Sequence, residues 1–156
     1  MDWILPKEIK LTSRTIQYDN IVTHNLRITD YPTMVGKGHA EEYLSIHQAP
    51  WEEDTNLSPW FTLRKLEGDF THYTFEKGYD IIYFDAFAPE KQPEMWEQSL
   101  FNCLYDKLNE GGILTTYCAK GVVRRMLQSA GFTVERLPGP PGGKREILRA
   151  TKPISE

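Results

Sequence analysis

The stretch YDIIYFDAFAPEKQPEMW, residues 79–96, joins a short apolar run to an acidic residue. Residues 81–84 are too few for a helix and too apolar for an exposed strand, so they predict a strand buried on both faces. Asp85 stands where this strand ends. Ligands of open α/β sheets bind at the carboxyl ends of the strands, which makes Asp85 a candidate site residue. The alternative is that Asp85 only caps a turn.

The residues after Asp85 suit a binding edge. Ala86 and Ala88 are small enough for a ligand to approach the backbone, and Phe87 offers a flat face to a base or ring. Pro89 stiffens the turn.

Helix and strand patterns alternate on the C-terminal side of this stretch. A helix is predicted over 93–112, with Pro93 in its first turn and Gly111-Gly112 at its end. The inner face of a second helix, over 122–131, is predicted to hold Val122, Val123, Met126, Leu127 and Ala130. Strands are predicted over 113–118, 132–137 and 146–151.

This alternation predicts an α/β fold, a doubly wound sheet with helices on both faces. A proline- and glycine-rich connection replaces the crossover helix before the last strand, which is therefore predicted to be antiparallel. In the N-terminal half we expect a strand near 14–21, a helix at 38–48, a loop at 49–59 and a strand at 61–67.

Composition favours an ordinary globular protein. The 156 residues predict one domain, 1–156, and the net charge of −4 argues against a general nucleic-acid coat. Cys103 and Cys118 have no paired spacing and are expected to be reduced thiols, and the N-terminus resembles neither a signal peptide nor a membrane span. We therefore expect a cytoplasmic protein. The four histidines show no metal-ligand spacing, so no metal is expected.

Charge is unevenly distributed along the chain. Residues 117–149 hold seven Lys or Arg residues against two acids, a net charge of +5, which leaves −9 for the rest. The segment is either a patch for an anionic ligand or an ordinary solvated surface.

Several motifs together resemble one known family. EGDF at 67–70, DAFAPEKQPEMW at 85–96 and GGILTTYCAKGVVRRMLQSAGFTVERLPGPPGGKREIL at 111–148 stand in the same order as in the methyltransferases that complete 5-methylaminomethyl-2-thiouridine at the tRNA wobble position. The resemblance is strong over residues 60–150 and moderate over 29–59. It implies a Rossmann-like class I methyltransferase fold, S-adenosylmethionine as cofactor and tRNA as partner. In some bacteria this domain is fused to an FAD-dependent oxidoreductase, which implies such an enzyme acting upstream.

The resemblance also implies roles for individual residues. Asp69 would hold the adenine end of the cofactor, and Asp85 would lie near both the transferred methyl group and the acceptor amine. Tyr117, at the end of the next strand, would line the same cleft if the two strands are parallel. The substrate side would comprise Phe87, Pro89, Tyr117, Lys144, Arg145 and Glu146, and an RNA patch would comprise Lys120, Arg124 and Arg125.

The chain departs from the family at its N-terminus. Its first glycine is Gly36, so the first strand and the glycine-rich loop of the cofactor site are missing, and residues 1–28 look divergent or truncated. We expect weak cofactor binding as a result. In the family's sheet the absent strand lies between the strand expected near 14–21 and the strand at 81–84. We expect its place to be taken by Trp3–Leu11 as a substitute strand, by direct pairing of the two flanking strands, or by a strand from a partner chain in a homodimer.

Two other functions compete with methyl transfer. One is a non-catalytic remnant or RNA-binding module of the same fold. The other is a Rossmann-like oxidoreductase, which the missing dinucleotide glycine fingerprint disfavours.

Overall fold

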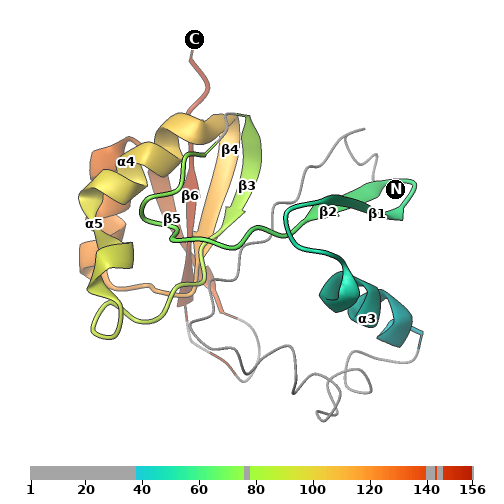
Figure 1. Ribbon diagram of the computed structural model, residues 1–156. Coiled ribbons are helices and arrows are strands. Elements are labelled where there is room, and N and C mark those ends of the chain that lie inside the picture. The colour runs from blue at the N-terminus through green and yellow to red at the C-terminus, as the bar shows by residue number, and fades with distance from the viewer. Residues whose placement is uncertain (1–37, 76–77, 140–142, 144–145, 156) are drawn as a thin grey trace. The chain divides into compact units, whose positions relative to one another are not determined.

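The structure is a computed structural model that describes residues 38–75, 78–139, 143 and 146–155. The chain forms two compact units, Met1–Gly68 and Asp69–Glu156 (Figure 1). The strand predicted near 14–21 and the substitute strand at Trp3–Leu11 lie outside the described residues, and the single-domain organisation stays a prediction. No helix among the described residues has the length and hydropathy needed to cross a membrane.

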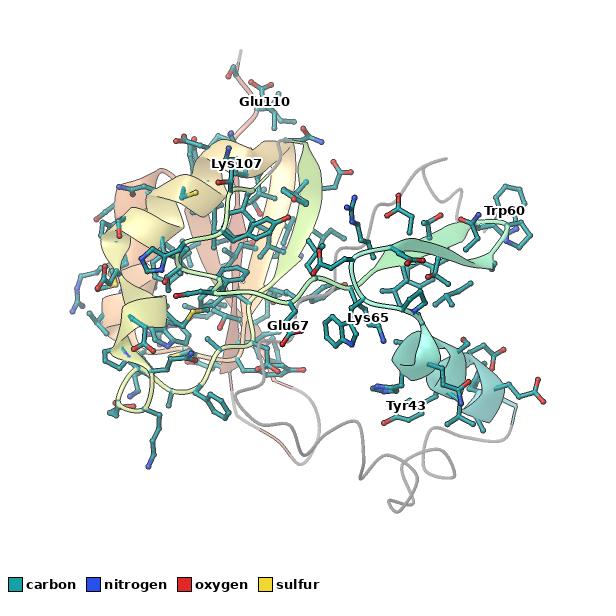
Figure 2. The ribbon with its side chains drawn as sticks, in the orientation of Figure 1. Tyr43, Trp60, Lys65, Glu67, Lys107 and Glu110 are labelled. Atoms are coloured by element: carbon teal, nitrogen blue, oxygen red, sulfur yellow. The ribbon has the colours of Figure 1, made fainter. Side chains whose placement is uncertain are left out.

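The described part of the first unit is a helix followed by a hairpin. Helix α3, Ala40–Gln48, confirms the predicted helix. The loop predicted over 49–59 is wrong at its end, because β1, Asp54–Ser58, pairs antiparallel with β2, Phe61–Arg64. The sequence there is polar, and the pairing is supported by a 2.7 Å hydrogen bond from Thr62 Oγ1 to Asn56 Oδ1. Figure 2 shows Trp60 at the tip of this hairpin.

The second unit holds a four-stranded mixed sheet. Its strands are β3, Tyr79–Tyr83, β4, Leu108–Thr116, β5, Thr133–Pro138, and β6, Glu146–Thr151, in the order β3-β4-β6-β5. β3 and β4 are parallel, whereas β6 is antiparallel to both β4 and β5. The predicted strands and the antiparallel last strand are therefore confirmed.

The helix predicted over 93–112 is shorter and interrupted. A 3₁₀ turn, η1, Pro93–Trp96, precedes helix α4, Gln98–Lys107, and Glu97 between them is extended. Gly111 and Gly112 do not end the helix but lie inside β4. A Cβ on Gly112 would stand 2.7 Å from the Asn109 carbonyl oxygen, so this glycine allows the close backbone approach at the irregular start of the strand.

The core of the second unit lies between the sheet and two helices on one face. Helix α4 packs beside α5, Gly121–Ala130 (Figure 1). Their buried side chains share one cluster with the strand residues Leu114, Leu148 and Ala150. The prediction for Val122 is wrong, since that side chain is 43% exposed while Val123 is fully buried. A second helical layer on the other face of this sheet is not found among the unit's described residues.

The burial of β3 does not match the burial that its composition predicts. Among the described strands it pairs with β4 alone, which places it at the edge of the sheet. Ile82 and Phe84 face the core, but Ile81 is 36% exposed and Tyr83 is 68% exposed. The prediction of a strand buried on both faces is therefore wrong for the described residues. An apolar run shows that a strand can be buried, but it does not show which other elements cover its two faces.

Candidate functional site

The parallel register of β3 and β4 brings the predicted site residues to one edge of the sheet. Tyr83 pairs with Thr115, and the Phe84 amide still donates to the Thr115 carbonyl at 2.8 Å. Continuing this register places Asp85 level with Tyr117, each just past its strand. The Asp85 side chain is exposed, and Tyr117 is 50% exposed. An exposed carboxylate and an exposed aromatic residue thus follow directly on the carboxyl ends of two neighbouring parallel strands.

The segment after β3 is anchored so that its aromatic side chain points outward. Phe84 is buried, with its ring 5.1 Å from that of Trp96 and nearly perpendicular to it. The Trp96 indole Nε1 donates a 2.7 Å hydrogen bond to the Phe87 carbonyl. The backbone of Phe87 is therefore fixed while its ring is 58% exposed. Pro89, half-buried, follows two residues later.

Asp69 organises its own loop. The Thr71 hydroxyl and backbone amide donate to Asp69 Oδ1 at 2.7 and 2.9 Å, and His72 Nδ1 lies 2.8 Å from Asp69 Oδ2. These hydrogen bonds, that of the Thr71 hydroxyl first, lower the pKa of Asp69 to about 2. The neighbouring Phe70 ring lies 6.1 Å from the ring of Phe84, so the Asp69 loop packs near the end of β3.

The connection from β5 to β6 reaches the same edge. Pro138 pairs with Glu146, and the antiparallel register of β6 on β4 places Glu146 past Leu148, towards the end of β4. Glu146 Oε2 accepts a 3.2 Å hydrogen bond from Arg136 Nη1. Lys144 and Arg145 lie outside the described residues, but both ends of their connection stand at the candidate site.

The residues predicted to form an RNA patch surround the start of α5. Lys120 is paired with Glu90, and its ammonium group holds the pKa of Glu90 below its usual value. Arg125 is exposed, and its Nη1 lies over Gly121. Arg124 is half-buried, and its Nε has no hydrogen-bond partner among the described residues. The three cations share one region, but only Arg125 is freely displayed.

Sequence reasoning missed four residues that shape this edge. Trp96 lies within the helix predicted over 93–112, and that pattern gives no sign that its indole donates a hydrogen bond to the Phe87 carbonyl. Thr71 and His72 follow Asp69 at the spacing of an Asx turn, a signal that the sequence does contain. The partner of Lys120, Glu90, lies 30 residues away and has no sequence signal. The described residues hold no group of three or more metal-ligating side chains.

Comparison with known proteins agrees with this geometry. Residues 41–153 match the family of S-adenosyl-L-methionine-dependent methyltransferases. Among solved structures, the chain is similar to MnmC2 from Aquifex aeolicus, with 26% identity and a TM-score of 0.58 over 78% of this chain and 41% of that one. It is similar in fold to a possible exported protein from Bordetella parapertussis, with 14% identity and a TM-score of 0.50 over 92% of this chain and 54% of that one.

The chain therefore spans between two fifths and just over half of these two relatives. The family match, by contrast, covers most of the chain, and it confirms a methyltransferase family with S-adenosylmethionine as cofactor, as expected from the motifs. With its mixed α/β sheet and a carboxylate at the carboxyl end of a parallel strand, this chain belongs to the S-adenosyl-L-methionine-dependent methyltransferases.

Proposed function

We propose that the chain transfers a methyl group from S-adenosylmethionine to the aminomethyl nitrogen of the modified wobble uridine in tRNA. The observation that carries the proposal is the exposed Asp85 at the carboxyl end of β3, in a methyltransferase sheet where Tyr117 follows the neighbouring parallel strand β4. Similarity to MnmC2 and the DAFAP and KRE motifs support tRNA as the substrate. The reaction would take place in the cytoplasm, after an FAD-dependent oxidoreductase has produced the amine.

Asp69 fits a role in holding the cofactor. S-adenosylmethionine supplies, when bound, a methyl group activated by its sulfonium. An ionised carboxylate offers about four acceptor positions, and the Asp69 loop uses three of them. One position on Oδ2 remains for an amino group such as that of adenine. The low pKa of Asp69 keeps this acceptor ionised at neutral pH.

Asp85 would act on the acceptor amine. A carboxylate accepts an amine N–H, orients the nitrogen lone pair and stabilises the positive charge that develops on nitrogen during transfer. The exposed position of Asp85 at the strand end leaves its oxygens available for this contact.

Aromatic side chains would hold the acceptor base. Phe87 and Tyr117 are exposed on neighbouring loops, and each presents a ring on which a base could stack. Pro89, Lys144, Arg145 and Glu146 would complete the substrate side, with the two cations on tRNA phosphates.

The first prediction tests Asp85 directly. Asp85→Asn removes the charge but keeps the shape, so methyl transfer to tRNA lacking the final methyl group should fall about 100-fold or more, with tRNA affinity unchanged. Asp80→Asn is the matched control, since Asp80 lies at the other end of β3 and accepts from Asn109, as an asparagine also could. For both variants, the rate of methyl transfer is measured by nucleoside mass spectrometry and the Kd for tRNA by filter binding.

An unchanged rate in the Asp85→Asn variant would remove Asp85 from the mechanism. If the unaltered chain binds tRNA but transfers no methyl group, the alternative of a non-catalytic RNA-binding module replaces the proposal. A homodimer in which a partner chain donates a strand remains one of three alternatives for the sheet, and sedimentation equilibrium tests it.

A further inference from the structure

An ion pair joins the two loops that carry the aromatic residues of the site. Glu90 lies in the loop after β3, three residues beyond Phe87, and Lys120 lies in the loop after β4, three residues beyond Tyr117. Lys120 Nζ donates to Glu90 Oε1. Both side chains are partly exposed, at 46% and 65%. The contact therefore spans the two loops near the outer surface of the site.

Each loop is fixed at its own base. The Lys91 and Gln92 amides donate to the Ala88 carbonyl at 2.7 and 3.1 Å, which closes a turn around Glu90. On the other side, the Lys120 carbonyl accepts the Arg124 amide at 3.1 Å, so Lys120 is the N-cap residue of α5. Because both partners stand on ordered backbone, the ion pair fixes the distance between the loops rather than only the side chains.

We propose that Glu90 and Lys120 form a latch that sets the spacing between Phe87 and Tyr117, and thereby positions the acceptor base. This inference rests on the proposed function for its substrate. An exposed pair of this kind adds little to global stability, but it can restrict local motion of two loops that are otherwise held separately. Lys120 is then a positioning residue engaged by Glu90, and not a contact to tRNA phosphate.

Charge reversal separates these two roles of Lys120. The variants are Lys120→Met, Glu90→Gln, the double variant, and the reversed pair Glu90→Lys with Lys120→Glu. Glu135→Gln is the matched control, because it breaks an ion pair with Arg149 of similar exposure, 43% and 48%, between β5 and β6. Exchange of the Lys91 and Gln92 amides is measured by NMR, and kcat and tRNA Kd are measured on the same proteins.

Each single variant should speed exchange of these two amides about two- to fivefold and lower kcat by a similar factor, with Kd unchanged. The double variant should be no worse than either single variant, because both remove one interaction. The reversed pair should restore slow exchange and kcat. Glu135→Gln should change neither quantity.

The latch is refuted if the reversed pair leaves exchange fast. It is equally refuted if Lys120→Met weakens tRNA binding and lowers its salt slope by about one while Glu90→Gln does neither, since that pattern marks a phosphate contact. A chain that transfers no methyl group to tRNA contradicts the proposed function but leaves the exchange measurement in place, so the two failures are distinguishable.

Discussion

At the scale of single residues, Asp69 shows how one carboxylate can organise its own loop and still leave an acceptor position open. The sequence indicated only that this aspartate stands where the family holds the cofactor. The structure adds that Thr71 and His72 already contact its carboxylate and that its pKa falls to about 2. Its loop therefore depends on the ionised form.

This dependence predicts a pH response. The pKa of Asp69 in the folded chain lies below the ordinary value of 3.8, so the stabilisation is complete above about pH 4 and is lost as the pH falls through about 2. The Asp69 carboxyl carbon should titrate with a midpoint near pH 2 by NMR. Asp69→Asn should abolish that titration and speed exchange of the Thr71 amide. A midpoint near pH 4 would show that the loop does not hold the carboxylate.

The position of a site residue could be predicted from the sequence where the residue directly follows a strand. Asp85 and Tyr117 each follow a strand, and parallel pairing alone places both at the same edge of the sheet. The Glu90–Lys120 contact could not be predicted, because it depends on how two loops fold back and no spacing records it. The predicted burial of Val122 is wrong for a related reason. Helical periodicity indicates which face of the helix a residue lies on, but it does not show whether the residue lies at the exposed edge of that face.

At the scale of secondary-structure elements, the C-terminus of α4 is closed by a residue from the end of the chain. Lys152 Nζ donates to the carbonyls of Tyr105 and Leu108, both at 2.9 Å, and lies 4.7 Å from the Tyr105 ring centroid. A cation at this end also interacts favourably with the helix dipole. The contact ties α4 to the segment after β6.

Removing this cap should destabilise the fold. Lys152→Met keeps most of the stem but leaves two partly buried carbonyls without their donor, at a cost of about 1–3 kcal/mol. Urea unfolding should show a lower midpoint with an unchanged m-value. Lys107→Met, in the last turn of the same helix, is the control and should change the midpoint little. Equal shifts in both variants would contradict a specific role for Lys152.

Element boundaries were the weaker part of the prediction. Residues 93–112 carry one helical pattern, yet Glu97 and the early start of β4 divide them. Leu100 and Leu104 in α4 are buried, and so are Trp96 and Leu108, which continue the same four-residue spacing but lie outside α4. Periodicity therefore identified what is buried. It could not separate a helix from the turn and strand that continue the same apolar pattern.

At the scale of the whole molecule, charge separates along the chain. Residues 117–149 carry a net charge of +5 within a chain of net charge −4. Of their described cations, Lys120, Arg124 and Arg125 lie at the start of α5, and Arg136 and Arg149 lie in β5 and β6. Lys144 and Arg145 belong to the connection whose two ends stand at that edge. Figure 2 shows Lys107 and Glu110 at the opposite edge of this unit, where β4 begins.

This arrangement predicts where tRNA phosphates bind. Replacing Lys144 and Arg145 together with alanine should weaken tRNA binding and lower the slope of log K against log salt by about two, one for each lost contact. Lys107→Ala removes the same kind of charge at the opposite edge and should leave the slope unchanged. A double variant that keeps the original affinity and slope would mean that these cations are only solvated surface.

Topology was the most predictable property at this scale. Strand–helix alternation predicted the parallel pair, and the proline- and glycine-rich connection predicted the antiparallel last strand. Coverage of the sheet was not predictable, because β3 is as apolar as a central strand although it stands at an edge among the described strands.

The strand order has a consequence for how the chain is made. β6 lies between β4 and β5 but follows both in the sequence, so it leaves the ribosome after the two strands that it joins. Leu148 and Ala150, both fully buried, reach the core only at that moment. Until translation has passed them, β4 and β5 have no common partner, and the apolar side of the sheet is open to chaperones and proteases. A nascent chain that stalls before Glu146 should therefore be degraded rather than accumulate as a partly active enzyme.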